Sequence, residues 1–156
     1  MNSAGHTAPR IKRECSPYRL RVGRSAIHRH GVFALEPIPR NRKVIEYTGE
    51  RLTWQQTVRL LRRLWRLGRP TNVYLFRLNR RWVINGAVGG NGSQFINHCC
   101  DPNLGLRRIR GHLVFFSRRK IRTGEELTFD YRFRKNVPKT PCRCGSPKCR
   151  GTINVK

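Results

Sequence analysis

Three short segments carry residues whose types and spacing suit them to chemistry. Residues 97–103 read Asn-His-Cys-Cys-Asp-Pro-Asn, residues 126–131 read Glu-Leu-Thr-Phe-Asp-Tyr, and residues 142–149 read Cys-Arg-Cys-Gly-Ser-Pro-Lys-Cys. Thiolates spaced this closely can bind Zn²⁺. A tyrosine hydroxyl can polarise a reaction centre without adding a permanent charge. The chain therefore offers metal ligands and polar groups suited to catalysis.

The six cysteines favour a metal site over a disulfide framework. Cys99 and Cys100 are adjacent, and one residue separates Cys142 from Cys144, so neither pair readily closes a strain-free local bridge. Clustered thiols are better suited to Zn²⁺ in a reducing compartment. Together with Cys149, the C-terminal cluster supplies three thiolates, which leaves a tetrahedral zinc one ligand short.

In order and spacing, these segments resemble the SET-domain protein lysine methyltransferases with a zinc-binding post-SET segment, of the trithorax-like and Suv39-like kind. The resemblance covers about residues 17–153, and the ending Cys-Arg-Gly-Thr-Ile-Asn is closest to the trithorax-like subgroup. It implies a mostly β fold of several small sheets, with a threaded, pseudoknot-like C-terminal segment, one inserted helix and a zinc-bound flap. The implied organisation is a basic N-terminal arm at 1–16, a SET domain at 17–133, and a linker with the post-SET zinc segment at 134–156.

The resemblance implies transfer of a methyl group from the co-substrate S-adenosyl-L-methionine to a lysine amine. Such an in-line displacement requires a neutral amine and a narrow apolar channel that aligns nitrogen, methyl and sulfur. Tyr131 matches the catalytic tyrosine, and Tyr47, in Glu-Tyr-Thr-Gly-Glu, matches a residue of the lysine channel. Phe129 falls where the family controls the number of methyl groups, and phenylalanine there implies room for di- or trimethylation.

Cofactor and metal contacts are likewise implied by the resemblance. The fourth zinc ligand is Cys100, which would fix the C-terminal flap over the cofactor and make Zn²⁺ structural. Cys99 is then a small buried filler, and Cys15 has no assigned partner. The residues expected around the cofactor are Arg29, His30, Gly31, Tyr74, Gln94, Phe95, Asn97 and His98.

Three positions depart from the family pattern. Arg29 occupies the first glycine of a Gly-x-Gly turn, Gln94 replaces a usual arginine, and Asn85 replaces a usual aspartate. The arginine is expected to strain or reshape the turn that approaches the cofactor.

Hydrophobic patterning places the supporting elements. A capping box, Thr53-x-x-Gln56, predicts a helix that ends at Gly68 and Pro70. Residues 37–41 are expected to form a loop, and 86–92 a glycine-rich irregular segment. Strands are predicted at 19–22, 31–35, 44–47, 113–117 and 126–129, with a hairpin of 73–78 and 81–84 turning at 79–80.

The predicted helix is amphipathic and basic. Trp54, Val58, Leu61 and Trp65 share one face, and four arginines lie on the other side. Three interpretations stay open: a core-packed helix with a solvated face, a surface for nucleic acid or a partner, and a helix on a membrane surface.

Charge dominates the composition, with 34 Lys and Arg against 8 Asp and Glu, a formal net charge of +26. Six of the eight acids lie in the segments that match the family: Glu46, Glu50, Asp101, Glu125, Glu126 and Asp130. Either the background is simply arginine-rich, or the charge binds nucleic acid.

We expect one domain that acts inside the cell as a monomer, in the nucleus of a eukaryote or otherwise in the cytoplasm. No apolar run is long enough for a membrane span, and residues 1–13 lack an apolar signal stretch. The predicted function is protein lysine N-methylation of a histone or another basic, chromatin-type protein. Methylation of a ribosomal or other non-chromatin protein shares the same chemistry. The alternative from another class is a non-catalytic, zinc-stapled module that binds nucleic acid or chromatin.

Overall fold

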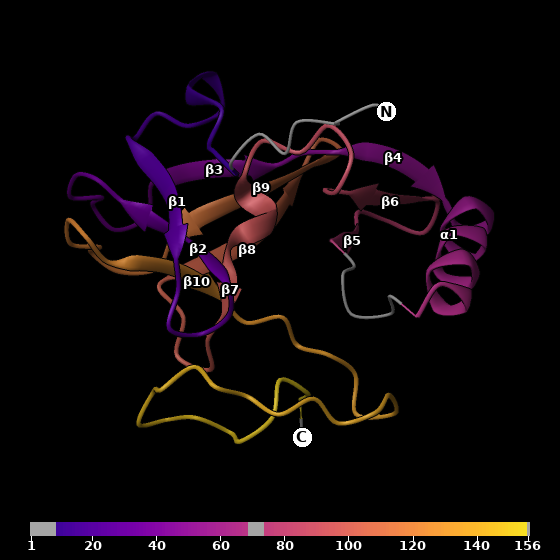
Figure 1. The fold of residues 1–156 in the computed structure, drawn as a ribbon. Coiled ribbons are helices and arrows are strands. Elements are labelled where there is room, and N and C mark those ends of the chain that lie inside the picture. Colours follow the sequence, from indigo (N-terminus) through magenta and orange to yellow (C-terminus); the bar gives the residue numbers. More distant parts are fainter. Residues whose placement is uncertain (1–8, 69–73, 156) are drawn as a thin grey trace, which may run out of the picture.

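A computed structural model describes residues 9–68 and 74–155 (Figure 1). In this part of the chain, short strands form three small sheets, and one α-helix lies at the edge of the molecule (Figure 1). The fold is mostly β, as predicted. The elements are β1 (Leu20–Arg24), β2 (His30–Ala34), β3 (Lys43–Tyr47), β4 (Glu50–Thr53), α1 (Trp54–Arg66), β5 (Leu75–Arg77), β6 (Trp82–Asn85), β7 (Asn97–His98), β8 (Leu104–Ile109), β9 (His112–Ser117) and β10 (Glu126–Phe129), with 3-10 turns at Arg13–Cys15 and Ser93–Phe95.

The first sheet joins distant parts of the sequence in the order β1-β2-β10-β7. β1 and β2 form an antiparallel pair in which Val22 lies opposite Val32, and Leu127 of β10 lies on the other side of Val32. β10 then pairs in parallel with β7, so that Thr128 lies opposite Asn97. This parallel pairing brings the two motif segments side by side.

The other two sheets are antiparallel, in the orders β3-β9-β8 and β4-β6-β5. β8 and β9 form a hairpin whose two-residue turn, Arg110-Gly111, has positive φ at both positions (46° and 80°). Turns of this type match the right-handed twist of the strands that they connect. The β5–β6 hairpin turns where it was predicted, although β5 is shorter than the predicted strand 73–78 and β6 lies one residue later than the predicted 81–84. Val73 lies outside the described residues.

The hydrophobic core is formed by residues of all three sheets and of the loops that connect them. β3 and β9 are buried along most of their length, and the continuous apolar run 113–116 of β9 fits this burial. An isolated bridge between Ile38 and Ile121 closes one end of the core with two backbone hydrogen bonds of 3.0 and 2.9 Å. The largest fully buried apolar side chains are Phe115, Ile38, Ile45, Leu78, Ile96, Leu104, Leu113, Ile121 and Leu127.

The helix α1 begins as predicted but does not pack as predicted. Thr53 and Gln56 form the expected capping box, and Gly68 follows the helix with φ 64°. Thr57 is the buried residue of α1, whereas the side chains of Trp54 and Trp65 are 59% and 76% exposed. The core-packed interpretation is therefore wrong. The reason is that α1 contacts β4 and β6, whose small sheet is too narrow to cover the apolar face.

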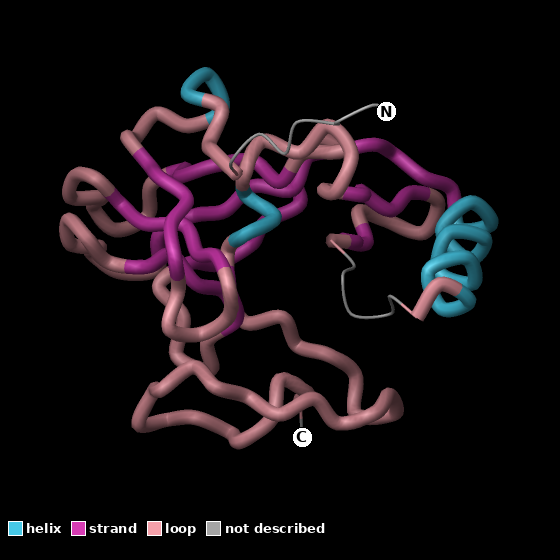
Figure 2. The backbone as a smooth tube through the Cα atoms, viewed as in Figure 1, coloured by secondary structure: helices cyan, strands magenta, loops and turns pink. Residues whose placement is uncertain are grey.

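The last part of the chain has a different character (Figure 2). Beyond β10 the described residues form loops, with isolated bridges joining Phe133 to Asn154 and Pro141 to Thr152. The amide nitrogen of the buried Asn154 donates to the backbone carbonyls of residues 134, 137 and 138, and its oxygen accepts from Thr140 and Thr152. One polar side chain thus takes the place of an apolar core in this segment, which we call the C-terminal flap (134–155).

Most predicted strands are present within one or two residues of their predicted ends. β4, β7 and β8 were not predicted. At the N-terminal end, residues 9–16 of the predicted basic arm lie against the domain, where the backbone amide of Lys12 donates to Asn91 and the hydroxyl of Ser16 donates to Val44. No helix among the described residues combines the length and apolarity required to cross a membrane.

Candidate active site and metal centre

Asn103 fixes the two motif segments together. Its side chain is 2% exposed; its amide nitrogen donates to the carboxylate of Glu125 and to the carbonyl of Glu126, and its oxygen accepts from the amide of Thr128. The backbone amide of Cys99 also donates to the carbonyl of Phe129. These bonds run beside the β7–β10 pairing, so the residues that follow each strand are held next to each other.

Next to this junction lies a cavity of about 380 Å³. It is lined by aromatic side chains from several elements, together with Gln94, Ile96 and four arginines. The aromatic side chains that line it are Tyr47, Tyr74, Phe76, Phe129, Tyr131 and Phe133. The three residues predicted as catalytic are therefore together in one place.

The hydroxyl groups of Tyr131 and Tyr47 both donate hydrogen bonds to backbone carbonyls of the protein. The hydroxyl of Tyr131 donates to the carbonyl of Ile96 at 2.9 Å, and that of Tyr47 donates to the carbonyl of Tyr74 at 2.7 Å. Burial raises the pKa of both hydroxyls well above the usual range for tyrosine. Both side chains therefore stay neutral near pH 7, and their oxygen lone pairs remain able to accept hydrogen bonds.

Phe129 packs between these tyrosines and the core. Its ring centroid is 4.7 Å from that of Tyr131, 4.9 Å from Phe115 and 5.6 Å from Phe76. It is 8% exposed and has no hydroxyl with which to hold water or a polar group in the cavity. The wall at this position is apolar and fixed by close packing.

His98 faces the flap rather than the cavity. It is 3% exposed, and its Nδ1 accepts from the backbone amide of Tyr131 at 3.1 Å. Burial lowers its pKa, and the nearby Arg150 acts in the same direction against the attraction of Asp130. Because Nδ1 accepts a hydrogen bond, the proton of the neutral ring belongs on Nε2, which lies 3.3 Å from the sulfur of Cys100.

Asn97 holds the turn predicted to approach the cofactor. Its amide nitrogen lies 2.8 Å from both the carbonyl of His30 and the carboxylate of Glu126. The hydroxyl of Ser25 donates to the same carboxylate at 2.8 Å. The side-chain amide nitrogen of Asn97 is thus used within the protein, which leaves its backbone and its oxygen for a ligand.

Glycine and arginine in this turn have distinct structural effects. A β-carbon at Gly31 would lie 2.2 Å from a carboxylate oxygen of Glu126, so glycine is what allows this carboxylate to reach Asn97. Arg29 has φ 40°, in the left-handed region that favours glycine. The predicted strain is therefore present at the position where the family pattern has glycine.

The remaining predicted cofactor residues gather around Phe95. Its ring makes edge contacts with His30 and Tyr74, each with centroids 5.7 Å apart. Gln94 and Tyr74 line the cavity, and the side-chain oxygen of Gln94 accepts from the amide of Gly92 at 2.9 Å. Arg29, His30, Gly31, Asn97 and His98 do not line the cavity; they lie in β2, in β7 and in the turn before β2.

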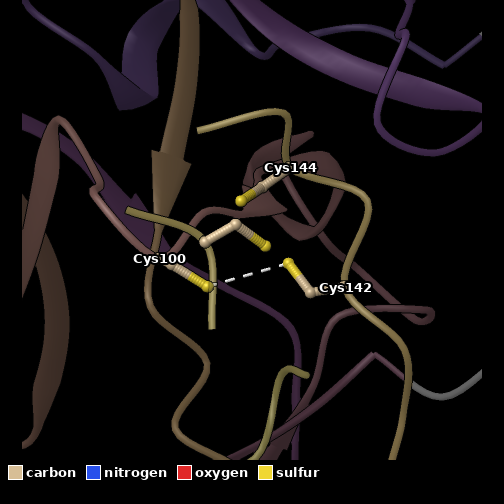
Figure 3. Close-up of side chains that lie close together, drawn as sticks. Cys100, Cys142 and Cys144 are labelled. Atoms are coloured by element: carbon tan, nitrogen blue, oxygen red, sulfur yellow. Dashed lines mark hydrogen bonds between the residues drawn. The ribbon is translucent and has the colours of Figure 1, made fainter. Parts of the chain in front are cut away.

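Four cysteines form a compact thiol cluster. Cys100, Cys142, Cys144 and Cys149 have sulfur atoms that all lie within 4.8 Å of one another, and those of Cys100 and Cys142 are 3.8 Å apart (Figure 3). Zn–S bonds of about 2.3 Å in a tetrahedron place sulfur atoms about 3.8 Å apart. The donor set and its spacing therefore fit a structural Zn²⁺, with Cys100 joining the three C-terminal thiols.

The surroundings of the cluster affect its thiols differently: burial raises the pKa of Cys100 and of Cys142, whereas the pKa of Cys144 is lowered. Although burial opposes it, hydrogen bonds from the backbone amides of Cys100 and Ser146 lower the pKa of Cys144 to about 6. The amides of Arg150 and Gly151 point at the sulfurs of Cys100 and Cys149, each at 3.4 Å. Cys99 is buried outside the cluster, in agreement with its expected role as a filler.

A clamp that the sequence analysis missed fixes the flap to the active-site segment. Arg150 donates from two nitrogens to the carboxylate of Asp130, at 2.8 and 2.9 Å, and both side chains are mostly buried. Two parallel hydrogen bonds of this kind also fix orientation. Because Asp130 precedes Tyr131, the clamp links the metal cluster to the cavity wall.

The arginines of the cavity were likewise not predicted, since they lie outside the motifs.

Comparison with known proteins agrees with this geometry. A family model described as SET domain matches residues 29–132. Human histone-lysine N-methyltransferase SETD1A is 39% identical over 140 residues, which is 87% of this chain and 8% of that protein. The H3 lysine-4 specific histone-lysine N-methyltransferases of Schizosaccharomyces pombe and Saccharomyces cerevisiae are 40% and 38% identical, over 87% and 84% of this chain. The chain spans 15% and 13% of the length of these two yeast proteins.

Proposed function

Because the chain belongs to the SET-domain family, we propose that it is an S-adenosylmethionine-dependent protein lysine N-methyltransferase. The observation that carries this proposal is the cavity in which Tyr47, Phe129 and Tyr131 meet. A lysine side chain is an apolar stem that ends in an amine, and a narrow aromatic channel matches both parts. The proposed catalytic tyrosine is Tyr131.

When bound, S-adenosylmethionine supplies a methyl group attached to a positively charged sulfur. The protein positions the acceptor: Tyr47 and Phe129 enclose the stem of the lysine and exclude water. The hydroxyl of Tyr131 donates a hydrogen bond to the carbonyl of Ile96. The lone pairs of the hydroxyl oxygen can therefore accept a hydrogen bond from the incoming amine. Alignment of this kind can lower a barrier by several kcal/mol, up to about 7–11 kcal/mol in well-oriented reactions.

Of the residues proposed to hold the cofactor, Tyr74 and Gln94 line the same cavity. The turn at Arg29, His30 and Gly31 would approach it through the backbone, and Tyr74 and Phe95 through aromatic faces. Asn97 and His98 would support this surface rather than line the cavity. The thiol cluster would hold Zn²⁺, which supplies a cross-link for the flap and takes no part in methyl transfer.

The proposed substrate is a lysine of a histone or another chromatin-type protein, and the proposed location in a eukaryote is the nucleus. The relatives named above are histone-lysine N-methyltransferases. A charge of +26 repels a free basic tail, and DNA offsets that repulsion when the substrate is nucleoprotein. Methylation should therefore be faster on nucleoprotein than on the free tail, and the difference should shrink from about 50 mM to about 200 mM salt.

Calorimetric titration of S-adenosylmethionine into zinc-loaded protein tests the proposal first. We expect saturable binding that is weakened in Cys100→Ser and retained in Tyr131→Phe. Methyl transfer to reconstituted nucleoprotein should be strongly reduced in both variants relative to the wild type. Mass spectrometry of the product tests whether Phe129 admits two or three methyl groups. Equal rates on nucleoprotein and free tail at both salt concentrations would contradict the proposed preference for chromatin.

A non-catalytic, zinc-stapled module that binds chromatin is the second candidate. The positive φ of Arg29 favours it, because strain at the cofactor turn opposes a tight fit. Absence of cofactor binding by folded, zinc-loaded protein would support this candidate. Restored binding in Arg29→Gly would then identify the arginine as the cause.

A further inference from the structure

The cavity carries an unusual charge for a site that accepts a lysine. Four of its lining residues are arginines, from β5, β8 and the segment after β10, and none of the lining residues is Asp or Glu. The four are Arg77, Arg108, Arg132 and Arg134. They come from three separate parts of the chain, and only Arg132 and Arg134 are close in sequence, so the fold brings the three parts together.

Two of these arginines are held in place by the backbone. Arg108 donates from Nε to the carbonyl of Leu78 at 3.0 Å and from Nη2 to the carbonyl of Arg77 at 3.1 Å. Arg77 donates from Nε to the carbonyl of Asn79 at 3.2 Å. Both guanidinium groups are therefore positioned before any ligand arrives, which reduces the entropy lost on binding.

Carboxylates of the protein do not neutralise this group. Arg19, Arg119 and Arg150 each form an ion pair, whereas none of the four cavity arginines has an acidic partner within 4.0 Å among the residues the structure describes. All four are exposed at the cavity. Their positive potential is therefore available to a ligand.

This potential acts on a lysine substrate in two ways. It lowers the pKa of the incoming amine, which favours the neutral form required for methyl transfer. It also opposes entry of a peptide that carries further positive charge. Carboxylates next to the target lysine would resolve the conflict, because they pair with guanidinium groups in a planar, bidentate geometry.

We propose, on the premise that the chain is a lysine methyltransferase, that Arg77, Arg108, Arg132 and Arg134 select target lysines that have aspartate or glutamate beside them. The selection concerns the sequence around the lysine and not the net charge of the substrate protein. A basic protein with a local acidic segment satisfies both this requirement and attraction to nucleic acid.

Three synthetic peptides test the proposal. They share one central lysine and differ in its neighbours, which are aspartate, glutamine or arginine. Methyl transfer and fluorescence anisotropy are both measured, with wild type, the double variant Arg77→Glu/Arg134→Glu, and Arg40→Glu. Arg40 is exposed and does not line the cavity, so this variant controls for net charge.

We expect kcat/KM of the wild type to be at least about tenfold higher for the aspartate peptide than for the arginine peptide, equivalent to about 1.4 kcal/mol. The double variant should reverse that order through the peptide KM, with the KM for S-adenosylmethionine unchanged, and Arg40→Glu should keep the wild-type order. Circular dichroism establishes that both variants are folded.

Four results would overturn the proposal: no preference in the wild type, a preference for arginine neighbours, an equal change in Arg40→Glu, or a change confined to the KM for S-adenosylmethionine. The last result would assign the arginines to the carboxylate of the cofactor. If no peptide is methylated, the proposed function fails, but anisotropy with the same peptides still decides whether the cavity prefers acidic sequences.

Discussion

The two parts of the candidate site are held together by different physical means. The body of the domain has a continuous apolar core and ladders of backbone hydrogen bonds, and the cavity tyrosines are fixed by packing against it. The C-terminal flap has isolated bridges, the hydrogen bonds of one buried asparagine, and three thiols that meet Cys100 of the body. Burial of apolar surface therefore stabilises the body, whereas the flap has a few polar groups and a thiol cluster that fits a metal.

The residues that we propose as catalytic therefore lie in a different part of the molecule from three of the four proposed metal ligands. Tyr47, Phe129 and Tyr131 belong to the body or to the end of its last strand. The flap contributes Cys142, Cys144 and Cys149, which do not line the cavity, although Arg134 at its first position does. A loss confined to the flap should therefore leave a folded domain with a poorly closed site, and a loss in the cavity should leave the flap intact.

Removal of zinc should have the largest effect on activity. It tests most directly whether the flap and the body are stabilised by different means. Chelation, or Cys144→Ser, is expected to abolish methyl transfer and to increase hydrogen exchange in residues 134–155 while the sheets stay protected. The reason is that the flap has no apolar core to replace the metal. Cys15→Ser, outside the cluster, serves as the control. Unchanged exchange in the flap after complete chelation would contradict this view.

Tyr131→Phe should lower kcat by about a hundredfold, since the variant lacks the one hydroxyl that we place at the reacting amine. Zinc content and the affinity for S-adenosylmethionine should remain close to those of the wild type, because the flap ligands are unaffected. Steady-state kinetics and calorimetry measure the two quantities. A parallel loss of cofactor affinity would show that the tyrosine belongs to the binding surface instead.

Asn103→Ala should destabilise the body by about 3 kcal/mol, because it leaves a buried amide of Thr128 without its acceptor and removes two further hydrogen bonds. Urea unfolding followed by tryptophan fluorescence measures the change. The exposed Asn136, in the flap, provides a matched Asn→Ala control that should change stability by less than about 0.5 kcal/mol. An equal loss of stability at Asn103 and Asn136 would contradict the view that Asn103 has a special role in the body.

The smallest expected effect is on the loss of stability of the body at acidic pH. Although burial alone acts to raise it, hydrogen bonds from Arg119, from the amide of Arg122 and from Asn103 hold the pKa of Glu125 below its usual value. This carboxylate therefore stabilises the body above its unfolded pKa of about 4.3, and the stabilisation is lost as the pH falls through the lower folded value. Glu125→Gln should lose about 1 kcal/mol at neutral pH and show a shallower loss of stability in acid. Unchanged acid dependence in that variant would refute this role.

Motifs with a fixed local geometry could be predicted from the sequence. The capping box at Thr53, the hairpin turn near Asn79 and the cysteine cluster each depend on a few neighbouring residues, so their patterns are informative. The resemblance placed Cys100 beside the C-terminal thiols and brought Tyr131 to the cavity. Both require contacts over long distances in the chain that composition and periodicity do not reveal.

Other features depend on partners that the sequence does not specify. The apolar face of α1 has helical spacing, but whether it is covered depends on the width of the sheet beneath it. β8 contains a glycine and two arginines, so it lacks the usual composition of a strand and forms because β9 lies beside it. The clamp between Asp130 and Arg150 and the arginines of the cavity arise from the packing of distant segments.

The order of the thiols along the chain has a consequence for how the protein is made. Cys100 precedes the sequence of β10, and Cys142, whose sulfur lies 3.8 Å from that of Cys100, follows 42 residues later. During synthesis the body can begin to fold from its N-terminal end, but a complete metal site must wait until Cys149 is available. Because a cross-link between these cysteines closes a loop around β10 and Tyr131, the metal restricts the unfolded chain as well as the folded one. Refolding should therefore proceed through a species with formed sheets and an open flap, and added zinc should capture it in a separate, later step.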